Sequence, residues 1–175
     1  MLRALLSNKA RDAALGILFD PDAAEAAHKT GVGKTITLGL GGEPKLGDRP
    51  FEGTFNIDFL SSGNLTVKGP MMRGAKISLG PTACLRIEGV SIVVGSSKVQ
   101  MLDRELYRVG GVEPEKMKIL VNKSSVHFRA DFTHIAHSIL VAESPGPMIA
   151  DPVNFPWKNL TPGVRIRPNG PVFKV

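Results

Sequence analysis

Hydrophobic residues in the first thirty positions recur at the spacing of a helix. Residues 3–15 place apolar side chains three to four positions apart and predict a first helix. A second helix is predicted to begin at Pro21, because Asp20 is a good cap and proline suits the first helical position. Gly31 is placed to end this second helix.

The stretch 31–35, Gly-Val-Gly-Lys-Thr, looks like the end of a phosphate-binding loop. The full pattern requires another glycine where this chain has His28. A phosphate-binding loop also leaves a strand and enters a helix, whereas this stretch leaves a predicted helix and enters a predicted strand. We interpret it as a helix stop, which argues against an ATPase of this kind.

From residue 35 the pattern changes to the alternation of apolar and polar residues that is typical of strands. Residues 35–40 alternate in this way and are followed by a glycine pair. Further strand candidates are separated by glycine-containing turns and cover residues 53–60, 65–68, 76–79 and 83–88. This middle region therefore predicts an antiparallel sheet or a partly closed barrel.

The next part of the chain carries short, continuous apolar runs, which are typical of strands buried on both faces of a parallel sheet. The three runs cover residues 90–95, 117–121 and 138–142. Helical patterns around 103–109 and 128–136 lie between them. We therefore expect three mutually parallel strands, with the helix after Ser125 crossing between the last two.

Together these patterns predict a mixed α+β and α/β fold. It has N-terminal helices, an antiparallel β-rich middle and a C-terminal three-stranded parallel α/β unit. One domain is expected over residues 1–145. Residues 146–175 are rich in proline and glycine but retain hydrophobic side chains, and we expect them to form a tail packed on the domain.

Composition narrows the function without identifying it. An apolar share of 42% and a charged share of 22% are typical of a soluble globular domain. No apolar run is long enough to span a membrane, and polar residues interrupt the N-terminal run before a signal peptide is complete, so a cytoplasmic protein is expected. The single cysteine, Cys84, lies in an apolar run and is expected to be a buried, inert thiol.

The net charge of +6 raises the question of nucleic acid binding. The basic residues are scattered and aromatic residues make up only 6% of the chain, which argues against a nucleic-acid partner. A modestly basic surface that faces an acidic substrate or partner explains the charge equally well.

The densest polar constellation is the ten-residue stretch 123–132, Lys-Ser-Ser-Val-His-Phe-Arg-Ala-Asp-Phe. It follows a predicted parallel strand, at the sheet edge where ligands collect in open α/β folds. Either serine can cap the next helix, whose free N–H groups suit an anion, and Lys123 and Arg129 can add charged contacts. The predicted ligand-binding residues are Lys123, Ser124, Ser125, His127 and Arg129. Alternatively, Ser125 caps the helix, the two phenylalanines pack, and the charges are only solvated.

Metal and nucleophile chemistry find little support in this stretch. His127 and Asp131 are four residues apart and can share a helix face, but no third ligand follows at helical spacing. His134 and His137 are interpreted as helix-terminal or surface residues. No nucleophile-elbow pattern is present. We therefore assign neither catalytic residues nor metal ligands within this chain.

The same ten-residue stretch resembles a signature of the MlrC-like metallopeptidases, a family named after an enzyme that degrades linearised microcystin. Other segments agree with the family in order, to about residue 145. They are Asp20-Pro21 with residues 31–33, then residues 38–42, 69–71, 79–83 and 100–103. Members of the family are longer, and the resemblance implies an additional N-terminal domain in which carboxylate and histidine side chains bind zinc.

The resemblance implies that this chain is the C-terminal domain alone, inactive in isolation, with zinc held in a separate N-terminal domain. The expected partners are that metal-binding domain and a peptide or small anionic substrate. Assembly into a homo-oligomer is left undecided by the sequence. Two alternatives remain at this point. One is a non-catalytic structural or oligomerisation domain, and the other is an independent module that binds a small anionic ligand.

Overall fold

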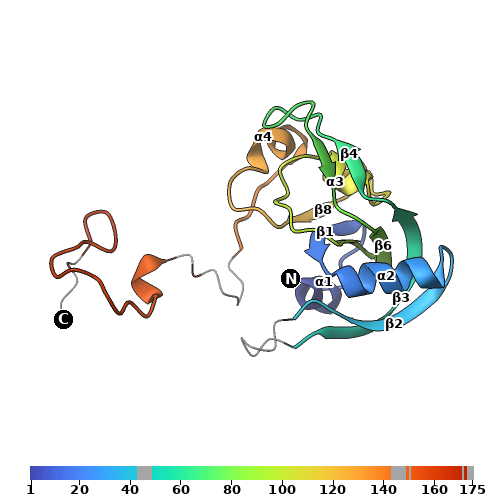
Figure 1. Ribbon diagram of the computed structural model, residues 1–175, viewed down its shortest axis with the longest axis horizontal. Coiled ribbons are helices and arrows are strands. Elements are labelled where there is room, and N and C mark those ends of the chain that lie inside the picture. The colour runs from blue at the N-terminus through green and yellow to red at the C-terminus, as the bar shows by residue number, and fades with distance from the viewer. Residues whose placement is uncertain (43–48, 143–148, 150, 171, 173–175) are drawn as a thin grey trace.

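The computed structural model describes residues 1–42, 49–142, 149, 151–170 and 172. A six-stranded mixed sheet with the strand order β2-β3-β6-β7-β1-β8 forms its centre (Figure 1). Strands β2, β3, β6 and β7 are joined antiparallel, and β1 is parallel to both β7 and β8. The bounds are β1 Ala13–Phe19, β2 Thr35–Leu40, β3 Phe51–Ser61, β6 Thr82–Ile87, β7 Val90–Gly95 and β8 Ile119–Asn122. The predicted mixed fold is confirmed.

The first predicted helix is wrong over much of its length. Helix α1 covers only Leu2–Ser7, and residues 13–19 form β1, a strand paired on both sides. Ala13 and Ala14 are fully buried on opposite faces of the sheet, in different core clusters. Alanine and leucine favour helices by propensity, but here burial between two packed layers decides the conformation.

The second predicted helix is confirmed as α2, Pro21–Thr30. The Asp20 side chain accepts a hydrogen bond from the N–H of Ala23 at 3.1 Å, and Gly31 follows with a φ of 97°. The helix buries its alanine face in a core cluster with residues of β2, β3, β6 and β7. Ala13 of β1 belongs to the same cluster. Because alanine side chains are short, the helix axis can lie close to the sheet.

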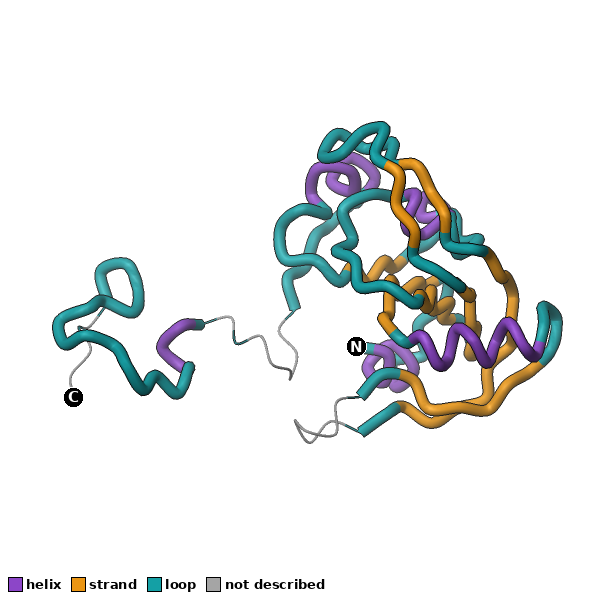
Figure 2. Tube along the Cα trace, viewed as in Figure 1, coloured by secondary structure: helices purple, strands orange, loops and turns teal. Residues whose placement is uncertain are grey.

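The opposite face of the sheet is covered by short elements (Figure 2). They are the two-stranded sheet of β4 (Asn64–Thr66) and β5 (Lys76–Ser78), helices α3 (Glu105–Arg108) and α4 (Arg129–Phe132), and the 3-10 turns 114–116 and 133–135. Their core cluster includes Leu79, Met101, Tyr107 and Phe132. The Tyr107 hydroxyl donates to the Val121 carbonyl and the Asn122 side-chain oxygen, each at 3.0 Å, and so ties this layer to β8.

The predicted parallel unit is only partly right. β7 and β8 run in the same direction, as expected, but β1 lies between them and is the third parallel strand. Residues 138–142 are not a strand, and Leu140 and Val141 are 91% and 78% exposed. The helix predicted over 128–136 is divided into α4 and the 3-10 turn at 133–135.

The described part of the tail, residues 151–170, forms hydrogen bonds within itself. The Trp157 indole N–H donates to the Pro152 carbonyl at 2.6 Å, and Arg167 pairs with Asp151. Trp157 and Val164 are exposed. The packing of residues 146–175 on the domain, and the domain boundary at 145, stay predictions.

Candidate ligand-binding site at the carboxyl edge of the sheet

The stretch 123–128 is a loop that leaves the carboxyl end of β8. The N–H of Lys123 donates to the Gly16 carbonyl at 3.2 Å, which continues the pairing between β8 and β1 for one more residue. The carbonyl of Lys123 then accepts a hydrogen bond from the N–H of Met101 at 3.2 Å. Because β7, β1 and β8 are parallel, their carboxyl ends share one edge of the sheet, and the loop lies on it.

All five predicted ligand-binding residues lie on this loop or in the first turn of α4. Lys123, Ser125, His127 and Arg129 are exposed, and Ser124 is half-buried. Ser124, and not Ser125, makes the local cap: its hydroxyl oxygen accepts from the N–H of Phe128 at 3.2 Å. The Arg129 guanidinium lies 5.3 Å from the centre of the Phe128 ring. The structure thus brings these residues together at one exposed edge, and their binding role stays a prediction.

The structure adds Gln100, which sequence reasoning missed as a site residue. Its side-chain oxygen lies 2.7 Å from Nδ1 of His127. The only signal in the sequence was that Gln100 begins one of the segments similar to the MlrC-like family. Nothing in that segment alone indicates that it contacts a residue 27 positions later.

Asp131 is not available as a metal ligand beside His127, because it is buried and paired with Arg104. Its exposed fraction is 4%, and Oδ2 accepts from the Arg104 backbone N–H at 2.7 Å. The same oxygen lies 3.2 Å from Arg104 Nε, close enough for an ion pair although too poorly aligned for a hydrogen bond. Burial lowers the pKa of Arg104, but contacts with Asp131 and Glu115 outweigh it and leave the pKa above its ordinary value.

A second buried carboxylate, Asp103, joins the β4–β5 connection to α3. It is fully buried and accepts from the backbone N–H groups of Lys68, Gly69 and Glu105 at 3.1, 2.5 and 2.8 Å. A Cβ atom on Gly69 would lie 2.6 Å from Asp103 Oδ2 and 2.9 Å from Asp131 Cγ. Only glycine fits here, because both carboxylates lie directly against the start of the loop 69–74.

Several of the other segments that carry the family resemblance reach the same edge. Asp20, directly after β1, accepts from the N–H of Gly41 at 3.1 Å. Ser96, directly after β7, donates its N–H to the Leu79 carbonyl at 3.0 Å and its hydroxyl to the Pro81 carbonyl at 2.8 Å. Segments far apart in the sequence therefore converge where the three parallel strands end.

A comparison with known families gives a match, over residues 1–159, to the model described as MlrC C-terminus. The chain belongs to the MlrC C-terminus family. The match covers both core layers and the loop after β8, so the whole candidate site lies within the family domain.

Two relatives place this MlrC C-terminal domain within longer proteins. Microcystinase C from Sphingomonas sp is 27% identical over 147 residues, which are 82% of this chain and 28% of that protein. A crystal structure of a "Putative metallopeptidase" from Mesorhizobium sp. BNC1 has the same fold, with a TM-score of 0.79 and 24% identity. The alignment covers 92% of this chain and 32% of that one. The chain thus spans less than a third of each relative.

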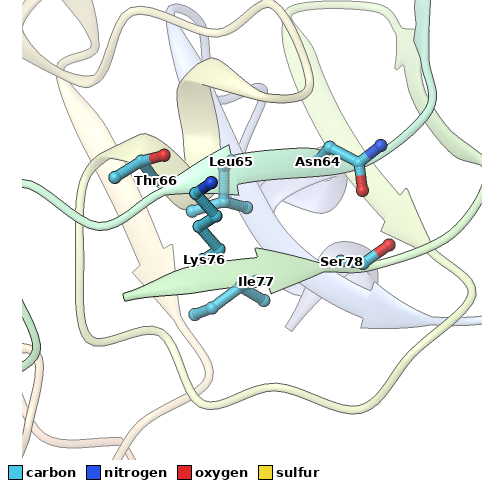
Figure 3. A pocket seen from close by; sticks show the side chains of 6 residues that line it. All are labelled: Asn64, Leu65, Thr66, Lys76, Ile77 and Ser78. Carbon is cyan, nitrogen blue, oxygen red and sulfur yellow. The ribbon is translucent and has the colours of Figure 1, made fainter. Parts of the chain in front are cut away.

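Two surface depressions in the described part of the MlrC C-terminal domain lie away from the candidate site. One, of about 360 Å³, lies on the β4–β5 hairpin and is lined by Asn64, Leu65, Thr66, Lys76, Ile77 and Ser78 (Figure 3). The other, of about 350 Å³, lies between β4 and α3. Its charged lining residues are paired with one another: Glu105 forms ion pairs with Lys68 at 3.2 Å and with Arg108 at 2.7 Å. Both are open and shallow, unlike an enclosed binding pocket.

Among the described residues of the MlrC C-terminal domain, three or more histidine, cysteine, aspartate or glutamate side chains nowhere gather as a metal site would require. The location of zinc outside this chain stays a prediction. Within the same residues, the helices are all too short or too polar to cross a bilayer.

Proposed function

We propose that this chain is the C-terminal, substrate-binding domain of a zinc-dependent MlrC-like peptidase. In this proposal the loop 123–129 faces the metal-binding domain and binds part of a peptide or another small anionic substrate. The observation that carries it is the exposure of the signature side chains at the carboxyl edge of three parallel strands. A purely structural role would be expected to bury His127, and His127 is exposed.

The chemistry of the loop suits a carboxylate. Lys123 and Arg129 provide charged donors that attract an anion, and Ser125 adds a hydroxyl. Zinc, held by the remainder of the enzyme, would activate water for attack on the peptide bond. In this arrangement the residues of the present chain orient the substrate and neutralise its charge, and none of them takes part in bond cleavage.

The backbone N–H groups at the start of α4, which the sequence suggested as anion donors, already have hydrogen-bond partners, so an anion would have to bind through side chains. Helix α4 is only four residues long and begins at Arg129, and the Phe128 N–H is already used by Ser124. The N–H groups of Arg129 and Ala130 donate to the carbonyls of Val126 and His127. A helix-terminus anion site is therefore not formed here, and the anion contact proposed rests on the side chains of Lys123, Ser125 and Arg129.

A binding experiment tests this proposal with the chain as it is. Tetra-alanine with a free carboxyl end should shift the amide resonances of residues 123–129 in a titration followed by NMR, and the C-terminally amidated peptide should bind much more weakly. Arg129→Ala should weaken the binding roughly ten- to a hundredfold, as expected for about 1.5–3 kcal/mol from one charge-assisted contact.

The matched control is Arg11→Ala, because Arg11 is also exposed but lies before β1, at the opposite end of the strands. Equal losses with both variants, or equal binding of the amidated peptide, would contradict the proposed site.

Hydrolysis provides a second test. The purified chain should not cleave a linear peptide with or without added zinc, because its described residues hold no three-ligand metal group. Metal-dependent turnover that a substitution within this chain abolishes would show that the domain is catalytic by itself. Activity restored by adding a separately expressed metal-binding domain would support the proposed division of roles.

A further inference from the structure

The loop 123–131 is fastened to the segment 100–104 at three points. The Met101 N–H donates to the Lys123 carbonyl at 3.2 Å, and the Arg104 N–H donates to Asp131 at 2.7 Å. Between these two lies the contact of Gln100 with His127, at 2.7 Å. Met101 and Asp131 are buried, so the flanking contacts are shielded from water and hold the exposed middle pair in place.

This contact determines which nitrogen of His127 carries the proton. The Gln100 atom in contact is the side-chain oxygen, which only accepts hydrogen bonds. Nδ1 of His127 must therefore be the N–H donor. In the neutral ring, Nε2 then carries the lone pair, and because His127 is exposed this nitrogen is accessible from solvent.

An acceptor at this position complements the rest of the loop. Lys123 and Arg129 can only donate, and they suit a carboxylate. A simple carboxylate needs nothing more, whereas a peptide also presents backbone N–H groups close to its carboxyl end. Nε2 of His127 is suited to accept one of these N–H groups while the two cations hold the carboxylate.

We propose that Gln100 is a positioning residue that fixes the Nδ1–H tautomer of His127, so that Nε2 accepts a hydrogen bond from a peptide bound at the carboxyl edge. The role toward peptide rests on the proposed function. The tautomer is a property of the free chain and is tested without a ligand. The carboxyl-terminal part of a peptide, which offers both a carboxylate and an N–H, suits this edge better than a small inorganic or organic anion.

The tautomer is measured by long-range proton–nitrogen NMR correlation of the histidine rings at a pH where His127 is neutral, with His127→Asn to assign its signals. We expect Nδ1 to be protonated in the natural chain. Gln100→Leu, similar in size but without an acceptor, should move His127 toward the Nε2–H form that a free imidazole prefers. Gln100→Glu, which keeps an acceptor, should preserve the Nδ1–H form.

An Nε2–H ring in the natural chain, or an unchanged ring in Gln100→Leu with its fold intact by amide NMR, would overturn the proposal. If Gln100→Leu does not fold, Gln100→Ala takes its place. Loss of the Nδ1–H form of His127 in Gln100→Ala would support the proposal, and persistence of that form would overturn it.

The proposed hydrogen bond between Nε2 of His127 and a peptide is tested with two ligands. They are tetra-alanine and glutarate, which has carboxylates but no N–H. Gln100→Leu should weaken tetra-alanine binding about three- to tenfold, as for one neutral hydrogen bond, and leave glutarate binding unchanged. Equal weakening of both ligands would refute the peptide role. Absence of binding by either ligand to the natural chain would refute the proposed function and this role together, while the ring spectra still decide the tautomer.

Discussion

Two buried carboxylates, Asp103 and Asp131, hold together the segments around the candidate site. Asp103 accepts three backbone N–H groups, and Asp131 is paired with Arg104. Burying a carboxylate is unfavourable unless its oxygens are hydrogen-bonded or paired, and both residues meet that condition. The signature residue Asp131 is therefore explained by loop placement and not by metal binding.

Replacing Asp131 with alanine should destabilise the fold by about 2–4 kcal/mol, because it leaves Arg104 without its buried partner. Chemical denaturation of the variant and the natural chain measures this difference. Glu25→Ala is the matched control, since Glu25 pairs with Lys29 on the exposed face of α2, and its stability should be unchanged within error. A loss below about 1 kcal/mol for Asp131→Ala would contradict the anchoring role.

The thiol of Cys84 provides a pH-dependent prediction. Burial, and to a smaller degree the charge of Asp58, raise its pKa from 9.0 to about 12. The folded state therefore favours the neutral thiol, and this contribution is complete below pH 9 and is lost as the pH rises toward 12. Native protein should react with a thiol reagent such as DTNB only as fast as it unfolds.

The free energy of unfolding should accordingly fall more steeply between pH 9 and 12 for the natural chain than for Cys84→Ala, after both are compared at neutral pH. Parallel curves, or rapid labelling of the folded protein, would show that the thiol is accessible.

The sequence alone points to the polar loop 123–129 but not to the contacts that position it. The five predicted ligand-binding residues follow an apolar run in one short segment, so a local pattern is enough to mark them: Lys123, Ser124, Ser125, His127 and Arg129. Gln100 and the pairing of Asp131 with Arg104 escaped prediction, because each contact joins segments 27 residues apart. A local pattern reports which faces are apolar, and it contains no information on which distant polar group will lie opposite.

At the scale of elements, the main difference from the sequence prediction is the exchange of one parallel strand for another. The helix predicted over residues 3–15 includes the alanine- and leucine-containing start of β1, yet residues 13–19 occupy the sheet between β7 and β8. The run 138–142 has the composition of a strand but pairs with no described strand. An apolar run becomes a strand only where a sheet edge accepts it, and composition cannot reveal that competition. The alternating strands of the middle region were correct because alternation is a local signal.

The start of α2 gives a prediction at this scale. Asp20 accepts from the N–H of Ala23 and from that of Gly41, so it caps the helix and also holds the end of β2. Asp20→Ala should reduce stability by about 1–2 kcal/mol. Asp22→Ala, an exposed first-turn carboxylate of the same helix, should cost clearly less, because only an interaction with the helix dipole is removed. Thermal unfolding of the two variants measures both effects, and equal losses would exclude the capping contact.

For the molecule as a whole, stability should be unevenly distributed. Strands β1, β6 and β7 each have a neighbour on both sides and lie between two core clusters, whereas β8 is four residues long and pairs with β1 alone among the described strands. Local opening occurs first where buried contacts are fewest. The elements that present the candidate site therefore lie on the less stable side of the fold.

Native-state hydrogen exchange tests this distribution. Amides of β1, β6 and β7 should exchange only through global unfolding, while those of β8 and the β4–β5 pair should exchange through smaller openings that depend little on denaturant. Tyr107→Phe should speed exchange in β8 more than in β6, because it removes the hydroxyl bonded to Val121 and Asn122. Uniform exchange across all strands would instead indicate a single cooperative unit.

The direction of the parallel strands also determines how the domain can be immobilised. Several segments similar to the family meet where β1, β7 and β8 end. The turn between β6 and β7, with the exposed Glu88, lies at the other end of the same strands. A biotin or a flexible tether attached at Glu88 would hold the domain on a sensor surface with the loop 123–129 directed outward. Oriented in this way, the chain could be used to capture peptides or a separately produced metal-binding domain without the attachment point blocking the edge under study.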